Sequence, residues 1–343
     1  MTKGSHLFEA IFAPGLEAVT EDELLRVLGQ RVTLHPSEAP GSIRFEYSGR
    51  PQDLLALRTI LSVSLIHHFA VPRPKALLGD QHLRAMLGDI EAARSLFPPD
   101  TFSTFYVSAA GADSPVMTRL KETIAGKTGL IARDTGDLQI RLRRSGDGWE
   151  ALTRLSPRPL TARSWRTCHR EGSLDAAVAH AMVLLTQPAA ADVFVNLCCG
   201  SGTLLIERLA RMPATMVAGC DIDPEALKCA QTNVTAAGYS KRIELADWDA
   251  RSIPMPDSAA DALVADLPFG TQVGSHAQNV PLYPAILREA ARIARPGARF
   301  CLLTGEIRLM TELLERSKHW TVEQSLRIRL AGLVPALFVL QRR

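Results

Sequence analysis

The sequence contains no unbroken apolar stretch of the ~18 residues that a membrane-spanning helix requires. No apolar signal region follows the first six residues, so we expect no secretory signal. The six cysteines show no paired spacing, which in a chain of 343 residues is typical of free thiols in a reducing compartment. There is no internal repeat and no low-complexity segment. These absences argue against a membrane protein, a disulfide scaffold and a fibrous repeat, and we expect a cytoplasmic protein.

What the sequence does have is an ordinary globular composition, with 46% hydrophobic and 22% charged residues. Its length suits two or three domains of roughly 100–200 residues each. The net charge of +3 hides an asymmetry, because residues 119–170 carry twelve Lys or Arg and five Asp or Glu, a local charge of +7. Basic faces bind polyanions largely through counterion release. The charge alone leaves two alternatives open, a nucleic-acid-binding face and a solvated basic surface.

The first 70 residues alternate the patterns of strands and helices. The expected strands are Leu7–Ala13, a weak one near Val32, Ser42–Tyr47 and Val63–Ala70, and the expected helices are Leu16–Leu28 and Asp53–Leu61. This β-α-β-β-α-β order is that of a ferredoxin-like unit.

Residues 76–155 predict a second unit, and the residues after Ser173 a third. The expected elements of the second unit are two short helices around 80–96, strands at Thr104–Ala109, Leu138–Leu142 and Ala151–Leu155, and a helix at Val116–Ile124. The stretch Ser156-Pro157-Arg158-Pro159 is typical of a linker. Beyond Ser173, strands and helices alternate to Leu303 and two strands follow, which predicts a parallel sheet flanked by helices.

The strongest single feature is a glycine-rich turn between a strand and a helix. The apolar run Val193–Leu197 leads into Cys198-Cys199-Gly200-Ser201-Gly202-Thr203, and Leu204–Met212 has the pattern of an amphipathic helix. Such a turn places backbone N–H groups and a helix N-terminus at the strand end, where a ligand can approach the glycine backbone closely. A dinucleotide fingerprint would need a third glycine where Leu205 stands, which counts against NAD.

Acidic residues follow the next three expected strands. The strands and their acids are Thr215–Cys220 with Asp221, Ile243–Ala246 with Asp247 and Asp249, and Ala262–Ala265 with Asp266. Asp221 can accept both hydroxyl protons of a ribose, and Asp249, or alternatively Asp247, the amine proton of an adenine. Asp223, which precedes Pro224, is better explained as a helix N-cap. Because the carboxyl ends of parallel strands meet at one edge, the acids predict a ligand site there.

The stretch Asp266-Leu267-Pro268-Phe269 suits the chemistry of an amine on a nucleic-acid base. Such an amine is a poor nucleophile because its lone pair is delocalised into the ring. A carboxylate and a neighbouring backbone carbonyl can each accept one N–H and aim the lone pair at an electrophile. Phe269 offers a face on which a flipped base can stack. The alternative is a polar strand end followed by a turn, with Phe269 in the core.

These residues resemble the class I S-adenosylmethionine-dependent methyltransferases. The match comprises Asn196-Leu197-Cys198-Cys199-Gly200-Ser201-Gly202-Thr203, Asp221-Ile222-Asp223-Pro224, Asp249-Ala250-Arg251 and Asp266-Leu267-Pro268-Phe269-Gly270. The last motif is similar to the D/N-x-P-F/Y signature of amino-group methyltransferases that act on nucleic-acid bases. Some members have proline where Leu267 stands, but the backbone carbonyl is what serves at that position.

More narrowly, the chain resembles the THUMP-domain tRNA guanine-N2 methyltransferases. The supporting stretches are Phe12-Ala13-Pro14-Gly15-Leu16-Glu17, Leu282-Tyr283-Pro284, Leu287-Arg288-Glu289-Ala290, Arg295-Pro296-Gly297 and Gly332-Leu333-Val334-Pro335. The resemblance implies an α/β class, with a Rossmann-like catalytic domain preceded by two α+β domains. The implied bounds are a ferredoxin-like domain at 1–75, a THUMP RNA-binding domain at 76–155, a linker at 156–172 and the catalytic domain at 173–343. The segment Glu171–Asp175 departs from the Pro-rich family pattern, so its cofactor contacts stay open.

The resemblance also implies roles for single residues. S-adenosylmethionine would be bound by Asn196, Cys198, Gly200, Gly202, Thr203, Asp221, Ile222, Asp249, Ala250 and Asp266. The catalytic residues would be Asp266, Leu267, Pro268 and Phe269, with the Asp266 carboxylate and the Leu267 carbonyl on guanine N2 and Phe269 stacked on the base. The tRNA acceptor end would be gripped by Lys121, Lys127, Arg141, Arg143, Arg144, Arg158, Arg163 and Arg166.

The expected function is therefore S-adenosylmethionine-dependent formation of N2-methylguanosine in tRNA, at position 6 of the acceptor stem, by a monomer. The alternatives are guanine-N2 methylation at tRNA position 10 or in rRNA, a non-catalytic RNA-binding protein with a degenerate methyltransferase fold, and an NAD-dependent oxidoreductase on the same sheet. We expect no metal, because no Cys or His cluster has ligand spacing. Gly126-Lys127-Thr128 lacks the first glycine of a Walker A motif, since Lys121 stands in its place.

Overall fold

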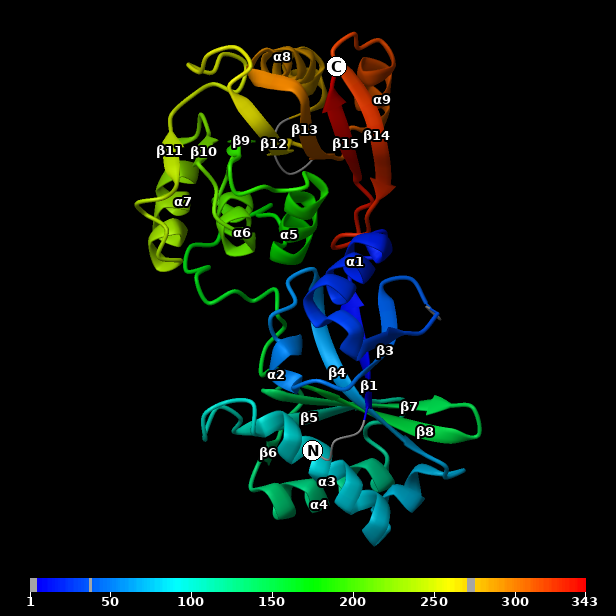
Figure 1. The fold of residues 1–343 in the computed structure, drawn as a ribbon. Coiled ribbons are helices and arrows are strands. Elements are labelled where there is room, and N and C mark those ends of the chain that lie inside the picture. Colours follow the sequence, from blue (N-terminus) through cyan, green and yellow to red (C-terminus); the bar gives the residue numbers. More distant parts are fainter. Residues whose placement is uncertain (1–4, 37–38, 270–274) are drawn as a thin grey trace. The chain divides into compact units, whose positions relative to one another are not determined.

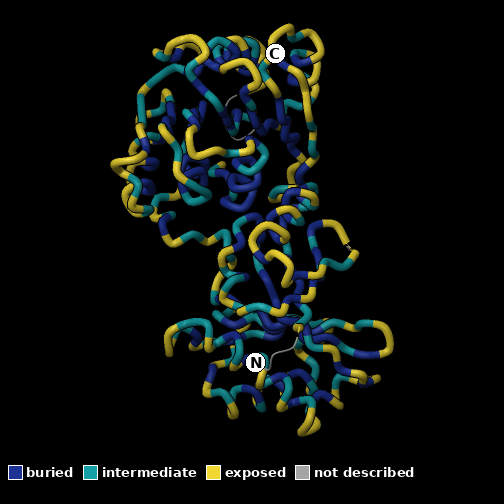
Figure 2. The backbone as a smooth tube through the Cα atoms, in the orientation of Figure 1, coloured by how far each residue is buried: buried dark blue, intermediate teal, exposed yellow. Residues whose placement is uncertain are grey.

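The computed structural model describes residues 5–36, 39–269 and 275–343, which form two compact units (Figure 1). The N-terminal unit takes the chain up to Phe12 and residues 20–161. The C-terminal unit takes Ala13–Val19 and residues 162–343. In both units the strands are largely buried and the exposed backbone lies mostly in turns and helix surfaces (Figure 2).

The N-terminal unit is built on one eight-stranded sheet in the order β2-β3-β1-β4-β8-β7-β5-β6. Its elements are β1 (His6–Phe12), α1 (Glu17–Leu28), η1 (Gly29–Arg31), β2 (Val32–Leu34), β3 (Ser42–Tyr47), α2 (Pro51–Leu54), β4 (Ile60–Phe69), η2 (Pro74–Leu78), α3 (Asp80–Arg94), β5 (Thr104–Ala109), α4 (Pro115–Thr128), β6 (Ile131–Ala132), β7 (Leu138–Ser145) and β8 (Gly148–Arg154). Helices α3 and α4 contact each other, and α3 also packs on β4 and β8.

The predicted β-α-β-β-α-β order of the first 70 residues is confirmed, with β1 between β3 and β4. Alternation in β3 buries Ile43, Phe45 and Tyr47 on one face, as a half-buried strand requires. The helix expected at Asp53–Leu61 is wrong in extent. Only Pro51–Leu54 are helical, because the apolar residues from Ile60 onward already pair in β4.

The first two predicted domains share a single sheet. β4 pairs with β8 in antiparallel register from Ser64↔Arg154 to Phe69↔Trp149. The predicted boundary at residue 75 therefore falls within η2 and does not separate two sheets. The two short helices expected around 80–96 are one continuous helix, α3.

A buried ion cluster crosses this junction. Glu9 of β1 is 3% exposed, and its carboxylate contacts Arg44 of β3 and both Arg141 and Arg143 of β7. Glu150 of β8 accepts 2.9 Å hydrogen bonds from Arg44 and Arg143. Burial alone would raise the pKa of Glu150, but hydrogen bonds from Arg143 and Ser145 outweigh it and hold that pKa below its usual value. The cluster thus fixes β7 and β8 to β1 and β3.

The C-terminal unit contains a seven-stranded sheet in the order β11-β10-β9-β12-β13-β15-β14. Its elements are α5 (Ala176–Leu185), β9 (Val193–Leu197), α6 (Thr203–Arg211), β10 (Met216–Cys220), α7 (Pro224–Ala236), β11 (Glu244–Ala246), β12 (Ala260–Asp266), α8 (His276–Ile293), β13 (Ala294–Thr304), α9 (Ile307–Glu315), β14 (Trp320–Arg327) and β15 (Ala336–Arg342). The first five strands are parallel and β15 is antiparallel to both of its neighbours. The predicted parallel α/β sheet ending in two further strands is confirmed.

Helices cover both faces of this sheet. α8 and α9 pack with Leu197, Ala265 and Phe338 in one apolar cluster. On the opposite face, Arg208 of α6 lies over the ring of Phe194 at 5.6 Å, and Figure 1 shows α5, α6 and α7 side by side. The strands are consequently buried on both faces, which explains why their sequences are apolar without alternation.

Candidate functional site

Three neighbouring parallel strands end at one edge of the seven-stranded sheet. β9 ends at Leu197, β10 at Cys220 and β12 at Asp266, and β9 lies between the other two. The strand order reverses at β9, because β10 follows on one side and β12 on the other. Open α/β sheets bind ligands at such a point. The structure thus brings the glycine-rich turn, Asp221 and Asp266 to the same end of the sheet, as expected from the sequence.

The pKa of the Cys198 thiol shows that three acidic side chains lie close to it. Burial is the main cause that raises its pKa, and the carboxylates of Asp221, Asp266 and Asp249 raise it further. All three acids therefore lie near the start of the glycine-rich turn. A thiol whose pKa is raised stays protonated at neutral pH and is a poor nucleophile, so Cys198 has no reactive thiolate to offer.

The glycine-rich turn uses glycine where backbone conformation and space require it. Gly200 and Gly202 have φ angles of +53° and +81°, a region that glycine adopts without strain. A Cβ on Gly219 of β10 would lie 2.5 Å from Leu205 Cδ1, so β10 and α6 approach each other closely. Thr203 then begins α6, whose first N–H groups lie at the strand end.

Asp221 supports the turn directly. Its Oδ2 accepts the N–H of Gly200 at 2.8 Å, and its Oδ1 accepts the N–H of Asp223 at 3.0 Å. Each carboxylate oxygen retains a second acceptor position, so hydroxyl groups can still bind. Ile222, the next residue, is 67% exposed and offers an apolar surface beside this carboxylate. Asp223 caps α7 through its side chain, as predicted.

Asp249 is held by a neighbouring arginine. Arg251 donates to it from the backbone at 2.9 Å and from Nη2 at 2.6 Å. The side-chain hydrogen bonds from Arg251 are the main reason that the pKa of Asp249 lies below its usual value. Asp249 is therefore anionic at neutral pH and can accept a proton-bearing amine, and the adjacent Ala250 is buried.

Asn196, which was expected to contact the cofactor, is the penultimate residue of β9 and is 0% exposed. Its amide nitrogen and oxygen have no hydrogen-bond partner among the described residues. The described contacts do not test whether this amide touches a cofactor at the end of β9, so its role stays a prediction.

The linker strap, which we define as residues 163–170, packs on the glycine-rich turn. Arg163 forms a buried 3.0 Å ion pair with Glu207 of α6. Arg166 donates to Thr203 Oγ1 at 2.9 Å and to the Leu174 carbonyl at 2.8 Å. The expectation that Arg163 and Arg166 bind RNA is corrected, because both guanidinium groups are used inside the C-terminal unit.

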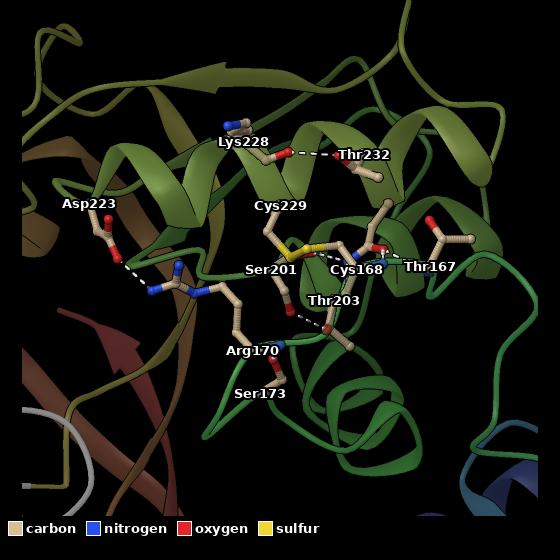
Figure 3. The surroundings of a disulfide bond; sticks show 11 residues. Thr167, Cys168, Arg170, Ser173, Ser201, Thr203, Asp223, Lys228, Cys229 and Thr232 are labelled. Atoms are coloured by element: carbon tan, nitrogen blue, oxygen red, sulfur yellow. Dashed lines mark hydrogen bonds and ion pairs between the residues drawn. A yellow bond between two sulfur atoms is a disulfide. The ribbon is translucent and has the colours of Figure 1, made fainter.

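Further contacts join the linker strap to α7 and its N-cap, and no sequence pattern indicated them. The Asn233 amide accepts from the N–H of Cys168 at 2.9 Å and donates to the carbonyl of Ser201 at 3.1 Å. Cys168 and Cys229 form a disulfide (Figure 3), which corrects the expectation that all six cysteines are free thiols. Arg170 pairs with Asp223 in the same view. The turn is therefore held from the linker side as well as by Asp221.

The stretch Asp266-Leu267-Pro268-Phe269, called the catalytic turn below, begins at the last residue of β12. Desolvation raises the pKa of Asp266 from 3.8 to about 7. The Leu267 N–H donates to the Leu303 carbonyl at 3.0 Å, which extends the pairing of β12 with β13. A Cβ on Gly305 would lie 3.0 Å from Phe269 Cβ, so Phe269 packs against a bare backbone. Phe269 is half-buried rather than a core residue, and Gly270 lies outside the described residues.

Two side chains of α8 also contact the catalytic turn, and sequence analysis had given them no role. Tyr283 Oη and Asn279 Nδ2 both donate to the Pro268 carbonyl, at 2.7 and 3.0 Å. Tyr283 lies in the Leu282-Tyr283-Pro284 stretch that supported the family resemblance. That stretch was the one sequence feature that could have indicated a role for Tyr283.

Six of the residues expected to bind RNA lie in the N-terminal unit. Arg141 and Arg143 pair with Glu9, and Arg143 also with Glu150, but their side chains remain 37% and 31% exposed, so their contacts with RNA stay a prediction. The remaining four expected residues lie at the surface or partly so, namely Lys121, Lys127, Arg144 and Arg158.

Within residues 5–36, 39–269 and 275–343, no helix is both long and apolar enough to cross a bilayer. The same described residues contain no group of three or more His, Cys, Asp or Glu arranged to hold a metal ion.

Comparison with known proteins places residues 163–335 in the family model described as UPF0020, "RMKL-like, methyltransferase domain". The mouse tRNA (guanine(6)-N(2))-methyltransferase THUMP3 is 30% identical over 183 residues, which are 50% of this chain and 36% of that protein. The chain thus spans about a third of the length of the first curated relatives that it matches. A tRNA (guanine(6)-N2)-methyltransferase of Thermus thermophilus is 27% identical over 354 residues, covering 97% of this chain and 99% of that protein.

Two solved structures show the same fold over nearly the whole chain. The crystal structure of TrmN from Thermus thermophilus aligns with a TM-score of 0.78 at 23% identity, covering 98% of this chain and 99% of that one. The structure of SMU.472 complexed with SAH aligns with a TM-score of 0.69 at 16% identity, covering 99% of this chain and 98% of that one.

Proposed function

Because the chain belongs to the UPF0020 family of RMKL-like methyltransferase domains, we propose that it transfers a methyl group from S-adenosylmethionine to N2 of guanine in tRNA. The observation that carries this proposal is the catalytic turn. It places a desolvated carboxylate, Asp266, beside the backbone carbonyl of Leu267, at the same end of the sheet as the glycine-rich turn. The relatives that bear the name of this activity, one of which aligns over almost the whole chain, support it.

The residues at the strand ends fit S-adenosylmethionine. The backbone at Gly200, where a Cβ would meet no atom of the described residues within 4 Å, leaves room for the methionine portion, and Asp221 has acceptor positions for the ribose hydroxyls. Exposed Ile222 and anionic Asp249 suit the face and the amine of adenine. When bound, the cofactor supplies a methyl group on a positively charged sulfur, which the carboxylates near Cys198 favour electrostatically.

Catalysis would consist mainly of orientation. The Asp266 carboxylate and the Leu267 carbonyl each accept one N–H of guanine N2, which turns its lone pair toward the methyl carbon. The N–C bond would form as the C–S bond of the bound cofactor breaks, with the bonding electron pair left on sulfur, and the extra proton on N2 would pass to Asp266 or to solvent. Phe269, supported by the backbone of Gly305, stacks on the base.

The nucleotide and the RNA contacts complete the proposal. We place the reaction at position 6 of the acceptor stem, with position 10 and rRNA as alternatives, on a monomer working in the cytoplasm. Residues 76–155 would act as the RNA-binding THUMP unit. Its contacts would come from Lys121, Lys127 and Arg144, and Arg158 would add one from the linker.

The test is methyl transfer from labelled S-adenosylmethionine to unmodified tRNA transcripts, followed by nucleoside analysis. N2-methylguanosine is the expected product, and Asp266→Ala should abolish it while cofactor binding persists. Asp257→Asn is the matched control, because Asp257 is an exposed acid of the same unit that pairs with Arg292. Tight RNA binding without cofactor binding would instead support the non-catalytic alternative, and oxidation of reduced nicotinamide would support an oxidoreductase.

A further inference from the structure

The Pro268 carbonyl accepts two hydrogen bonds from one helix. Tyr283 Oη donates at 2.7 Å and Asn279 Nδ2 at 3.0 Å, and both residues of α8 are 0% exposed. One partner satisfies most buried backbone carbonyls. A second donor from a rigid, packed helix therefore points to a carbonyl whose direction matters.

The protons in this network can run in only one direction. Thr304 Oγ1 accepts the Glu306 N–H at 2.9 Å and lies 2.7 Å from Tyr283 Oη. Because the Pro268 carbonyl has no proton to give, the Tyr283 proton points to it, and the Thr304 proton points to the Tyr283 oxygen. A chain of hydrogen bonds therefore runs from the end of β13 through two hydroxyl groups to the catalytic turn. Burial is the main cause that raises the pKa of Tyr283, so the phenol remains a donor at the pH of any assay.

Proline and tyrosine together leave the turn no rotational freedom at this point. The ring of Pro268 fixes its φ angle. The two hydrogen bonds from α8 fix the direction of the Pro268 carbonyl, and hence its ψ angle. With both dihedrals set, the Leu267 carbonyl before Pro268 and the Phe269 ring after it hold one mutual orientation.

We infer that Tyr283 is a positioning residue for methyl transfer, which acts through Pro268 to set the Leu267 carbonyl, the Asp266 carboxylate and the Phe269 ring against the target base. The inference rests on the proposed function and adds to it a residue outside the catalytic turn. It explains why a tyrosine hydroxyl is placed at a site where phenylalanine would satisfy packing alone.

The test compares Tyr283→Phe with a matched control. Tyr283→Phe keeps the ring and removes the hydroxyl. Trp320→Phe removes another buried bond, from Trp320 Nε1 to the Leu287 carbonyl at 3.0 Å, within the same apolar cluster but away from the turn. We expect Tyr283→Phe to lower kcat roughly 10- to 100-fold, the effect of misaligning reacting groups. The KM for tRNA and the Kd for S-adenosylmethionine should change less than about twofold, and Trp320→Phe should keep its kcat.

A second pair of variants tests the hydroxyl chain. Thr304→Ser keeps the hydroxyl and should retain kcat, whereas Thr304→Val removes it and should lower kcat in the same direction as Tyr283→Phe. Equal kcat for Tyr283→Phe and the wild-type enzyme would overturn the inference. So would losses of kcat that simply follow thermal stability in both Tyr283→Phe and Trp320→Phe.

The same assay separates this inference from the proposed function. Nucleoside analysis identifies the product, and the ratio of wild-type to variant kcat reports on Tyr283. A product other than N2-methylguanosine with a slowed Tyr283→Phe variant would refute the proposed function and support the inference. N2-methylguanosine formed at equal rates would do the reverse.

Discussion

The desolvated Asp266 carboxylate should make the protein less stable at the pH where the protein is most active. Burial raises its pKa from 3.8 to about 7. The folded state therefore binds this proton more tightly than the unfolded state, and stability falls as the pH rises from 3.8 to about 7. At 1.36 kcal/mol per pH unit, the ionised group costs about 4 kcal/mol at pH 8 and roughly 2 kcal/mol at pH 5.

Asp266→Asn removes the ionisation but keeps the shape of the side chain. The variant should thus be more stable than the wild-type protein at pH 8 by up to about 4 kcal/mol, with the difference shrinking toward pH 4. The measurement is urea unfolding of both proteins, without cofactor, at intervals from pH 4 to pH 8.5. Asp257→Asn should show no such growth of the difference with pH, because Asp257 is 77% exposed.

The pH dependence of catalytic activity is an independent test of the Asp266 ionisation. Because an ionised Asp266 is the better acceptor for guanine N2, kcat/KM should rise with pH to a plateau above about pH 7 and be about tenfold lower at pH 6. Asp266→Asn should lose this rise. A stability difference between the two proteins that is independent of pH, together with a flat kcat/KM profile for the wild-type enzyme, would refute the reasoning.

Four further predictions concern the supports of the two units. Gly219→Ala should lower the free energy of unfolding by about 1–3 kcal/mol and weaken cofactor binding measured by calorimetry, because a Cβ at Gly219 would overlap Leu205 of α6. Unchanged cofactor binding would contradict this prediction. Glu150→Ala should cost about 3 kcal/mol in urea unfolding by removing one of the two carboxylates that pair Arg44 and Arg143, without changing the cofactor Kd. This cost should shrink as the pH falls through the lowered pKa of Glu150, and a cost that is independent of pH would contradict the reasoning. Cys168→Ser, or reductant, should lower the free energy of unfolding by about 2–4 kcal/mol, because the disulfide joins residues 61 positions apart in the chain. An unfolding free energy that does not change with reductant would argue against the Cys168–Cys229 pairing. Lys127→Ala and Arg144→Ala should each reduce the slope of log K against log salt for tRNA by about 1, whereas unchanged slopes would remove them from the RNA interface.

The sequence predicted best where local pattern and chemistry coincide. Val193–Leu197, the glycine-rich turn and the acids after β10 and β12 were placed correctly, because short apolar runs and glycines are local signals and parallel strands bring their carboxyl ends together. The β-α-β-β-α-β order was found in the same way. The extent of the helix after Pro51 was not, since pairing in β4 overrode the helical pattern.

What the sequence alone determined about this protein is its sheet pattern, its family motifs and the acids that carry the chemistry. Only the tertiary structure decided which charges are used internally, as Glu9 and Arg163 are, and which remain at the surface. It also decided the support of the catalytic turn by Tyr283 and of the glycine-rich turn by Asn233. The physical reason is distance along the chain. A hydrogen bond or ion pair between residues tens of positions apart leaves no periodic trace in the sequence and exists only once the strands and helices are packed.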